Sequence, residues 1–150
     1  MTVQSIMSTR LVTVELDDKL KAVKEIFDRM KFHHLLVVEE GRLVGVVSDR
    51  DLLRALSPFI GGMMEADRDV ATLNRRVHQI MTRKLITLEP QSAVADAAAL
   101  FLAHDISCIP VVDKASRPVG ILSWRDVLRS AAAPPSRDAG QVASAPIQSS

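Results

Sequence analysis

The sequence predicts an α+β fold made of two pseudo-symmetric copies of one β-α-β-β-α unit. One observation is a duplication, in which Met7 returns as Met81 and Gly45 returns as Gly120, each within a matching run of residues. The other is that strand-like runs, helix-like runs and turns follow one another in the same order in both copies. Because an internal repeat fixes the architecture, two units of this size predict a pseudo-two-fold pair with two equivalent clefts.

Each copy is expected to begin with a short strand and an amphipathic helix. Residues 11–14 and 85–88 are short runs of aliphatic and β-branched residues, which are typical of strands. Asp17 or Asp18 in the first copy, and Ser92 in the second, then offer an N-cap. The positions that recur at helical spacing are Leu20, Val23, Ile26, Phe27 and Met30 in the first copy and Val94, Ala97, Phe101 and His104 in the second. This spacing predicts one helix in each copy.

The second part of each copy is expected to form a hairpin that leads into another helix. Residues 35–38 and 109–112 are continuous apolar runs, which are typical of strands covered on both faces. The remaining predicted elements are turns at 39–42 and 113–117, strands at 43–47 and 118–122, and helices that begin at Ser48 and Ser123.

Composition narrows the class of protein. The chain has 150 residues and a net charge of +1, with acidic and basic residues interleaved, so it lacks the electrostatic signature of nucleic-acid binding. Its single cysteine, Cys108, excludes an internal disulfide and fits a reducing compartment. No run approaches the roughly 18 apolar residues of a membrane span, and the first residues do not resemble a signal peptide. We therefore expect a cytoplasmic protein that binds neither membranes nor nucleic acid.

The duplication also suggests a division of the chain. A copy of about 50 residues buries too little apolar surface to be stable alone, so we expect the two copies to share a core. The expected parts are a first repeat at 1–58, a linker at 59–75, a second repeat at 76–133 and a C-terminal tail at 134–150. The polar linker is expected to be partly helical. The small, polar, proline-bearing composition of the tail predicts flexibility.

A Ser-x-x-Asp motif stands at the start of the last predicted helix of each copy, as Ser48 with Asp51 and Ser123 with Asp126. One interpretation is structural: the pair forms a capping box, in which the serine and the acid bond to backbone N–H groups at the helix start. The other is functional, because a helix N-terminus at a cleft attracts anions and a carboxylate there can bind the two hydroxyls of a ribose. The two roles are compatible, and both remain open.

Arg50 and Arg125 precede the two aspartates by one position. A guanidinium group at this place can contact a phosphate. It can equally remain a solvated surface group, and the sequence does not decide between the two.

The pattern Gly-apolar-apolar-Ser-x-x-Asp-apolar-apolar, together with the opening Ile-Met of both copies, resembles the cystathionine-β-synthase (CBS) domain. The resemblance covers residues 6–130, and the chain is similar to a tandem pair of CBS domains, or Bateman module. It implies that the two repeats pack sheet to sheet as one module. It also implies a regulatory homodimer that requires no cofactor and binds an adenosine-containing ligand in one or both clefts: AMP, ADP, ATP, S-adenosylmethionine or an NAD-type dinucleotide.

The resemblance also implies ligand contacts, residue by residue. Asp51 and Asp126 fall on the positions that hold the ribose, and Ser48 and Ser123 fall on the hydroxyl positions beside them. The other implied contacts are Arg10 and Lys84 for phosphate, and Val12, Ile86, His33, His34, Ser107 and Cys108 for the adenine base.

The two copies differ at positions that affect the predicted clefts. The second copy has Pro110 where the first has Leu36, and it has Trp124 where the first has Asp49. An indole at the start of a helix can stack on a ligand or block the cleft. We therefore expect two unequal sites, of which the first is the more open.

The sequence predicts neither a metal site nor a catalytic centre. His33 and His34 are adjacent on a predicted strand, so their side chains point to opposite faces and cannot hold one ion together. Cys108 has no basic sequence neighbour that would lower its pKa. We expect a protein that is not an enzyme. The alternative to a nucleotide sensor is an interaction scaffold of the same fold, with clefts that are empty or structural and contacts only to other proteins.

Overall fold

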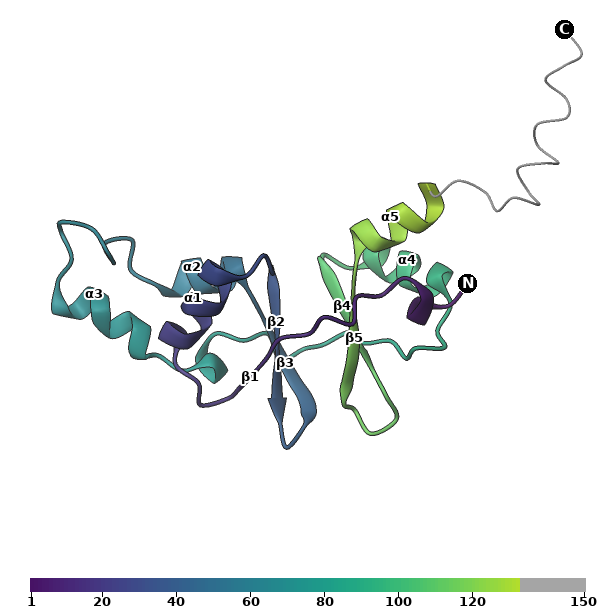
Figure 1. Ribbon diagram of the computed structural model, residues 1–150, viewed down its shortest axis with the longest axis horizontal. Helices are drawn as coiled ribbons and strands as arrows, with labels where there is room; N and C mark the ends of the chain where they lie inside the picture. Colours follow the sequence, from purple (N-terminus) through teal and green to yellow (C-terminus); the bar gives the residue numbers. More distant parts are fainter. Residues whose placement is uncertain (133–150) are drawn as a thin grey trace, which may run out of the picture.

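The two copies form two lobes that lie side by side. The structure is a computed structural model that describes residues 1–132. Figure 1 shows the strands of both lobes near the middle of the molecule and the helices toward its two ends. The predicted α+β class is confirmed. The tail predicted at 134–150 lies outside the described residues. None of the helices within residues 1–132 combines the length and the apolar character that crossing a membrane requires.

The first lobe contains a three-stranded sheet in the order β1-β2-β3, in which β1 is parallel to β2 and β2 is antiparallel to β3. Its elements are β1 (Thr13–Glu15), α1 (Leu20–Arg29), β2 (His34–Glu39), β3 (Arg42–Ser48) and α2 (Asp49–Ala55). Glu40 and Gly41 join β2 to β3 with positive φ angles of 51° and 78°. A two-residue turn of this kind matches the twist of the two strands that it connects.

The second lobe contains a two-stranded antiparallel sheet. Its elements are α4 (Val94–Ala103), β4 (Cys108–Val112), β5 (Pro118–Ser123) and α5 (Trp124–Ala132). The strand predicted at 85–88 is not formed, and Leu88 makes only an isolated parallel bridge with Val111. The prediction of a third strand in this lobe was therefore wrong.

A proline explains the missing strand. In the first lobe the Leu36 N–H donates to the Val12 carbonyl over 3.1 Å, and this bond extends the pairing that β1 makes with β2. Pro110 occupies the matching position of the second lobe and has no N–H to donate. The backbone pairing with β4 is therefore limited to two hydrogen bonds of Leu88. Its N–H donates to the Pro110 carbonyl, and its carbonyl accepts from the Val112 N–H.

The starts of α1 and α4 also differ from the prediction, because none of Asp17, Asp18 and Ser92 is an N-cap. The Asp18 carboxylate accepts from the Glu15 N–H over 2.8 Å, and Ser92 Oγ accepts from the Glu89 N–H over 3.1 Å. These bonds close the turn ahead of each helix. The residues at the N-cap positions are Lys19 and Ala93, which make no side-chain cap bond.

The first residues of each copy cross to the other lobe. The short 3-10 helices within residues 1–132 are η1 (Val3–Ser5), η2 (Thr72–Asn74) and η3 (Val77–Gln79). The Val3 N–H donates to the Ser92 carbonyl of the second lobe over 2.8 Å. The Val77 N–H donates to the Asp18 carbonyl of the first lobe over 2.9 Å. The Asp18 and Ser92 carbonyls, which lie ahead of α1 and α4, thus accept hydrogen bonds from distant parts of the chain.

Each crossing segment then forms a short bridge to a strand of the other copy. Ser8 and Ile121 exchange two backbone hydrogen bonds of 2.9 Å. Val46 and Thr82 exchange two of 3.1 and 2.9 Å. Strands β3 and β5 are therefore each joined by the first residues of the other repeat.

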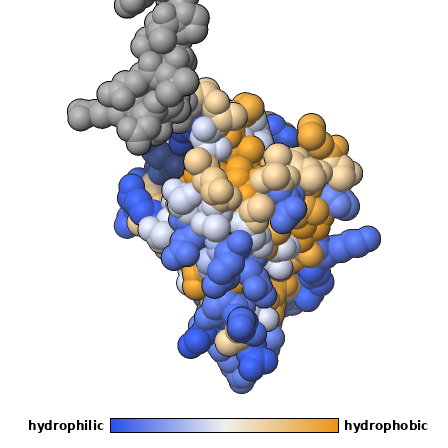
Figure 2. All heavy atoms as spheres, turned by 90° about the vertical axis from the view of Figure 1, so that its right-hand side faces the viewer, coloured by the Kyte–Doolittle hydropathy of each residue, from blue (hydrophilic) through white to orange (hydrophobic). Residues whose placement is uncertain are grey.

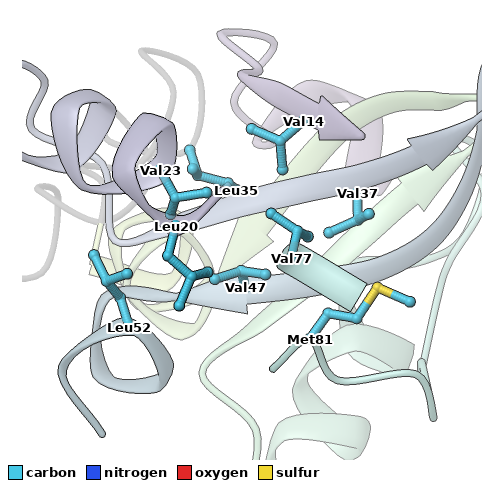
Figure 3. Close-up of a cluster of buried hydrophobic side chains, with 9 residues drawn as sticks. All are labelled: Val14, Leu20, Val23, Leu35, Val37, Val47, Leu52, Val77 and Met81. Carbon is cyan, nitrogen blue, oxygen red and sulfur yellow. The ribbon is translucent and has the colours of Figure 1, made fainter. Parts of the chain in front are cut away.

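Most buried apolar side chains form two clusters, one in each lobe, where the sequence predicted a single shared core; the buried Leu36, Val46 and Ile109 belong to neither cluster. The first cluster, drawn in Figure 3, contains Val14, Leu20, Val23, Leu35, Val37, Val47, Leu52, Val77 and Met81. The second contains Val3, Ala97, Val111 and Leu122. Val77 and Met81 lie at the start of the second repeat but pack in the first lobe, and Val3 lies at the start of the first repeat but packs in the second. The copies therefore depend on each other through exchanged segments.

The predicted linker is partly helical and is anchored to the first lobe. It contains α3 (Asp67–Ala71), where the buried Asp69 carboxylate accepts from Ser57 Oγ over 2.6 Å and from the Ala66 N–H over 2.8 Å. These two hydrogen bonds hold the pKa of Asp69 below its usual value. The linker therefore has a defined position against the end of the first repeat.

We expect Gly45→Ala to destabilise the protein more than Gly120→Ala. A Cβ atom at position 45 would lie 2.6 Å from Met81 Sδ and 3.1 Å from the Thr82 carbonyl oxygen, which belongs to the backbone bridge. At position 120 the nearest atoms all belong to the flexible side chain of Met7. Overpacking costs about 1–3 kcal/mol, and we expect Gly45→Ala to lie in this range and Gly120→Ala below it. Denaturant unfolding of the two variants measures the difference.

Met7→Ala provides the matched control. It should remove most of the cost of Gly120→Ala and leave the cost of Gly45→Ala unchanged. Equal losses of unfolding free energy in the two glycine variants would show that the backbone contact at Thr82 does not matter.

Candidate functional site

Both Ser-x-x-Asp motifs form capping boxes. Ser48 Oγ accepts from the Asp51 N–H over 3.1 Å, and Asp51 Oδ2 accepts from the Ser48 N–H over 2.9 Å. Ser123 Oγ accepts from the Asp126 N–H over 3.3 Å, and Asp126 Oδ2 accepts from the Ser123 N–H over 2.8 Å. The motif therefore fixes where α2 and α5 begin, directly after β3 and β5.

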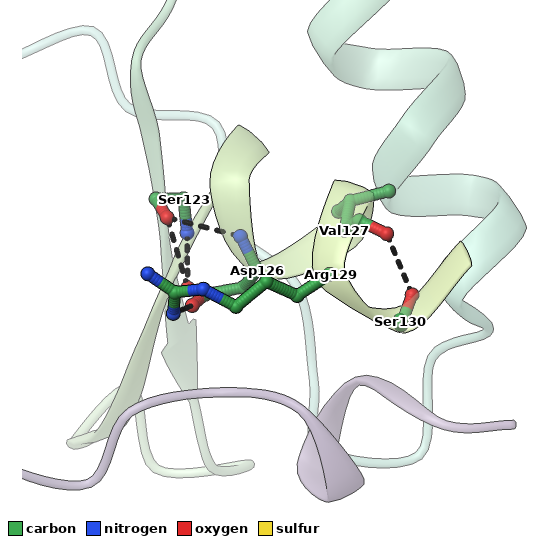
Figure 4. Close-up of polar contacts among 5 residues, drawn as sticks. All are labelled: Ser123, Asp126, Val127, Arg129 and Ser130. Atoms are coloured by element: carbon green, nitrogen blue, oxygen red, sulfur yellow. Dashed lines mark hydrogen bonds and ion pairs between the residues drawn. The ribbon is translucent and has the colours of Figure 1, made fainter. Parts of the chain in front are cut away.

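The Asp126 carboxylate still has an oxygen that takes no part in the cap. Both cap bonds that it accepts from Ser123, one from the N–H and one of 3.0 Å from Oγ, go to Oδ2 (Figure 4). Its other oxygen, Oδ1, lies 3.5 Å from Arg129 Nη1, one helical turn farther along α5. This leaves Oδ1 with lone-pair capacity for a ligand hydroxyl.

Residues from both copies line one cleft of about 660 Å³ between the lobes. The predicted site residues that line it are Arg10, His33, His34, Ser48, Arg50, Ser107, Cys108, Ser123, Arg125 and Asp126. The predicted site residues that do not are Val12, Asp51, Lys84 and Ile86. The two helix starts thus face a shared space, whereas the repeat had suggested two equivalent clefts.

Asp51 and Asp126 occupy different environments. Asp126 lines the shared cleft, whereas Asp51 lines a smaller pocket of about 240 Å³ together with Arg54, Ala55, Arg75 and Ile80. Asp126 therefore faces the larger space and Asp51 the smaller one.

The cleft also contains residues that the sequence reasoning did not select as ligand contacts. They are Ser8, Lys31, Phe32, Asp49, Ile121 and Arg129. Trp124, which the sequence analysis considered as able to stack on a ligand or to block the cleft, also lines it. Arg129 follows Asp126 by three positions, a helical spacing that places the two side chains together and was visible in the sequence. Ser8 and Ile121 reach the cleft through the bridge between the copies, which no local pattern indicates.

Positive charge dominates the cleft. Its cationic side chains are Arg10, Lys31, Arg50, Arg125 and Arg129, and its acids are Asp49 and Asp126. The whole chain has a net charge of only +1, so the cations are concentrated where the copies meet. A concave site of this kind raises the local concentration of anions.

The adjacent histidines serve different partners. His33 Nδ1 lies 3.0 Å from Asp49 Oδ2 within the first copy, whereas His34 Nε2 lies 2.8 Å from Ser107 Oγ of the second copy. Desolvation by burial lowers the pKa of His34 despite the opposing effect of the Asp49 charge. A neutral His34 thus links the two copies by a hydrogen bond in the cleft.

The chemistry of the remaining candidates is limited. Burial raises the pKa of the Cys108 thiol to about 12, which keeps it protonated and poorly nucleophilic. Within residues 1–132, no group of three or more His, Cys, Asp or Glu side chains is placed to hold a metal ion. The five cationic side chains make the cleft suited to binding an anion.

Comparison with known proteins gives consistent matches. The CBS domain family model matches residues 3–58 and 77–133. A CBS domain-containing protein of Dictyostelium discoideum is 34% identical over 128 residues, which are 84% of this chain and 88% of that protein. The chain spans less than half the length of several other curated relatives that it matches.

Two solved structures with adenosine ligands are similar. One is the CBS domain pair of the protein MJ0100 in complex with 5′-methylthioadenosine and S-adenosyl-L-methionine, with a TM-score of 0.71, 27% identity, and coverage of 88% of this chain and 96% of that one. The other is CBSX2 in complex with AMP, with a TM-score of 0.71, 29% identity, and coverage of 87% and 96%. Together with the family match to both repeats, these likenesses show that the chain belongs to the CBS domain family and carries a tandem pair of the domain.

Proposed function

We propose that this CBS pair is a regulatory sensor that binds an adenine nucleotide or a related adenosine ligand in the cleft between its two copies. The observation that carries the proposal is that a helix start, a carboxylate whose Oδ1 takes no part in the helix cap and five cationic side chains meet in one cleft. The complexes of similar CBS pairs with AMP and with S-adenosyl-L-methionine support the choice of ligand class.

Each part of a nucleotide has a counterpart in the cleft. Asp126 Oδ1 is the acceptor for the ribose hydroxyls, and Ser123 holds the carboxylate in place. Arg10, Arg50 and Arg125 are candidates for the phosphate group, because a guanidinium donates paired hydrogen bonds to phosphate oxygens. Lys84, Val12 and Ile86 lie outside the larger cleft and have no assigned contact in this proposal.

The proposed regulation requires no chemical step. The cleft includes side chains from both lobes, so a bound ligand favours the arrangement of lobes that contacts it best. A ligand shifts such an equilibrium by its difference in affinity for the two arrangements. A scaffold without a ligand is the second candidate, and the two capping boxes are the observation that favours it, since they give both motifs a structural role.

A panel of nucleotides tests the ligand class. We expect AMP, ADP, ATP or S-adenosylmethionine to raise the thermal unfolding temperature more than GTP or CTP does. A ligand at about 100 times its Kd adds roughly 2.7 kcal/mol to the unfolding free energy. GTP and CTP keep the ribose and the phosphates of ATP and change only the base. Equal shifts with ATP, GTP and CTP would point to charge alone and count against an adenine sensor.

Replacing Asp126 separates the sensor from the scaffold. If Asp126 binds the ribose, Asp126→Ala removes charge-assisted hydrogen bonds of about 1.5–3 kcal/mol, which corresponds to roughly 10- to 100-fold weaker binding. Asp126→Asn keeps the shape and some hydrogen bonding and should lie between Ala and wild type. Calorimetry with AMP measures the affinities.

Asp51→Ala is the matched control, because it breaks the same kind of capping box outside the larger cleft. Both alanine variants should lose about 1 kcal/mol of stability as their caps are lost. Only Asp126→Ala should lose affinity. If AMP binds both variants as tightly as wild type, the carboxylates serve only as caps and the scaffold is favoured.

We also propose that the protein forms a homodimer through an apolar surface on its helices. Leu53 on α2 and Leu128 on α5 occupy matching positions of the two copies and are 73% and 55% exposed. Leu102 on α4 is 89% exposed. Figure 2, which views the second lobe end-on, shows apolar atoms gathered over the upper part of that face and hydrophilic atoms below. Exposed apolar surface of this kind marks an interaction site, and a second copy offers the same surface.

Charged substitutions test the dimer. We expect Leu53→Glu combined with Leu128→Glu to convert a dimer into a monomer, because burying two unpaired carboxylates in an apolar interface is strongly unfavourable. Light scattering coupled to size exclusion measures the mass. Met63→Glu is the control, since this residue is fully exposed in the linker, away from α2 and α5. A wild-type protein that remains monomeric at high concentration would contradict the proposal.

A further inference from the structure

Trp124 is a large aromatic residue held at the edge of the shared cleft. It is the first residue of α5 and lines the cleft, yet 46% of its surface is exposed. It is also the single tryptophan of a chain that has no tyrosine. An indole displayed in this way is available to cover a flat apolar ligand group.

A cation already lies over this indole. The Arg125 guanidinium carbon lies 5.7 Å from the centroid of the Trp124 ring, within the range of a cation–π interaction. The contact holds the indole against its neighbour and places a positive charge beside it. A base that stacks on Trp124 therefore has a partner for its phosphate group in the next residue.

The acceptor proposed for the ribose lies on the same turn of helix. Asp126 follows Trp124 by two residues, lines the cleft and has a side chain that is 17% exposed. A ring platform, a carboxylate and a guanidinium thus stand within one turn of α5. These are the groups that a base, a ribose and a phosphate require.

The matching residue of the first copy has no ring on which a base could stack. It is Asp49, whose carboxylate pairs with His33 Nδ1 over 3.0 Å. The other aromatic residue of the cleft, Phe32, is partly buried and lies beneath Arg10, with 5.8 Å between the guanidinium carbon and the ring centroid. The larger and more exposed ring belongs to the second copy.

We infer that Trp124 stacks on the nucleotide base and is a specificity-determining residue of the cleft, favouring purines because they offer the larger ring surface. The inference rests on the proposed function, since it assigns the base of that ligand to the second copy. It gives the bound nucleotide one orientation, with its base on the indole and its ribose at Asp126.

Tryptophan fluorescence tests the contact directly, because all of the indole emission of the protein comes from this residue. We expect AMP to change the intensity and position of the emission in a saturable titration. Ribose 5-phosphate, which lacks the base, should leave the emission unchanged at the same concentrations. An unchanged spectrum with AMP, under conditions where calorimetry detects AMP binding, would overturn the inference and leave the proposed function standing.

Substitutions separate stacking from a distant effect on the indole. Trp124→Leu keeps an apolar side chain but removes the ring, and we expect AMP to bind roughly 5- to 100-fold more weakly, the range of base stacking on an aromatic residue. Trp124→Phe should retain most of the affinity. Trp124→Leu should also reduce the preference for AMP over CMP, which carries the same ribose and phosphate.

Phe32→Leu is the comparison at the other aromatic residue and should have the smaller effect. A larger loss with Phe32→Leu than with Trp124→Leu would place the base in the first copy and overturn the inference. So would wild-type affinity in Trp124→Leu. If calorimetry detects no nucleotide bound to the wild-type protein, both the inference and the proposed function fail, and that result is distinct from the others.

Discussion

The reciprocal exchange of the first residues of the two repeats is the constraint on which the rest of the structure depends. Val3 completes the cluster of the second lobe, while Val77 and Met81 complete that of the first. Backbone bonds from Val3 and Val77 fix the turns ahead of α4 and α1. A repeat separated from its partner would lose part of its core and these bonds. The cleft lies where the copies meet, so the same exchange that stabilises the lobes also positions the site.

The exchange gives the sequence motif a physical meaning at each of its positions. The glycine leaves room for the crossing segment, as the approach of Met81 and the Thr82 carbonyl to Gly45 shows. The serine and the aspartate, three and six residues later, begin the helix through a capping box. One short stretch of chain thus determines how the copies cross and where the helix starts. In both copies it brings the arginine before the aspartate to the space between the lobes, and in the second copy it also brings the carboxylate there. A motif with so many local roles is recognisable in both copies even where the surrounding residues differ.

The sequence predicted the class of fold, the order of elements and both capping boxes, because periodicity and capping are local properties. It missed features that depend on distant chain. Asp18 and Ser92 look like N-caps, but their side chains close turns whose carbonyls bind the crossing segments. The strand at 85–88 has suitable residues and lacks only the N–H that Pro110 cannot supply. In the cleft, ten of the fourteen predicted residues come together, whereas Phe32 and Lys31 reach it through the packing of lobes that no short pattern encodes.

The differences between the copies turn a symmetric scaffold into an asymmetric site. The backbone presents two equivalent helix starts to one cleft, but the residues after the two serines are Asp49 and Trp124. At this position the first copy therefore presents the Asp49 carboxylate paired with His33, and the second copy presents the Trp124 indole paired with the Arg125 guanidinium. A nucleotide is itself asymmetric, with a flat base at one end and negative charge at the other, so unlike halves can hold it in a single orientation. Because His34 and Ser107 already join the copies at this place, a ligand in the cleft contacts both lobes at the point where they are linked. The binding free energy of a ligand can then bias the arrangement of the two lobes. Such a change moves the lobes relative to each other and requires no refolding of either one.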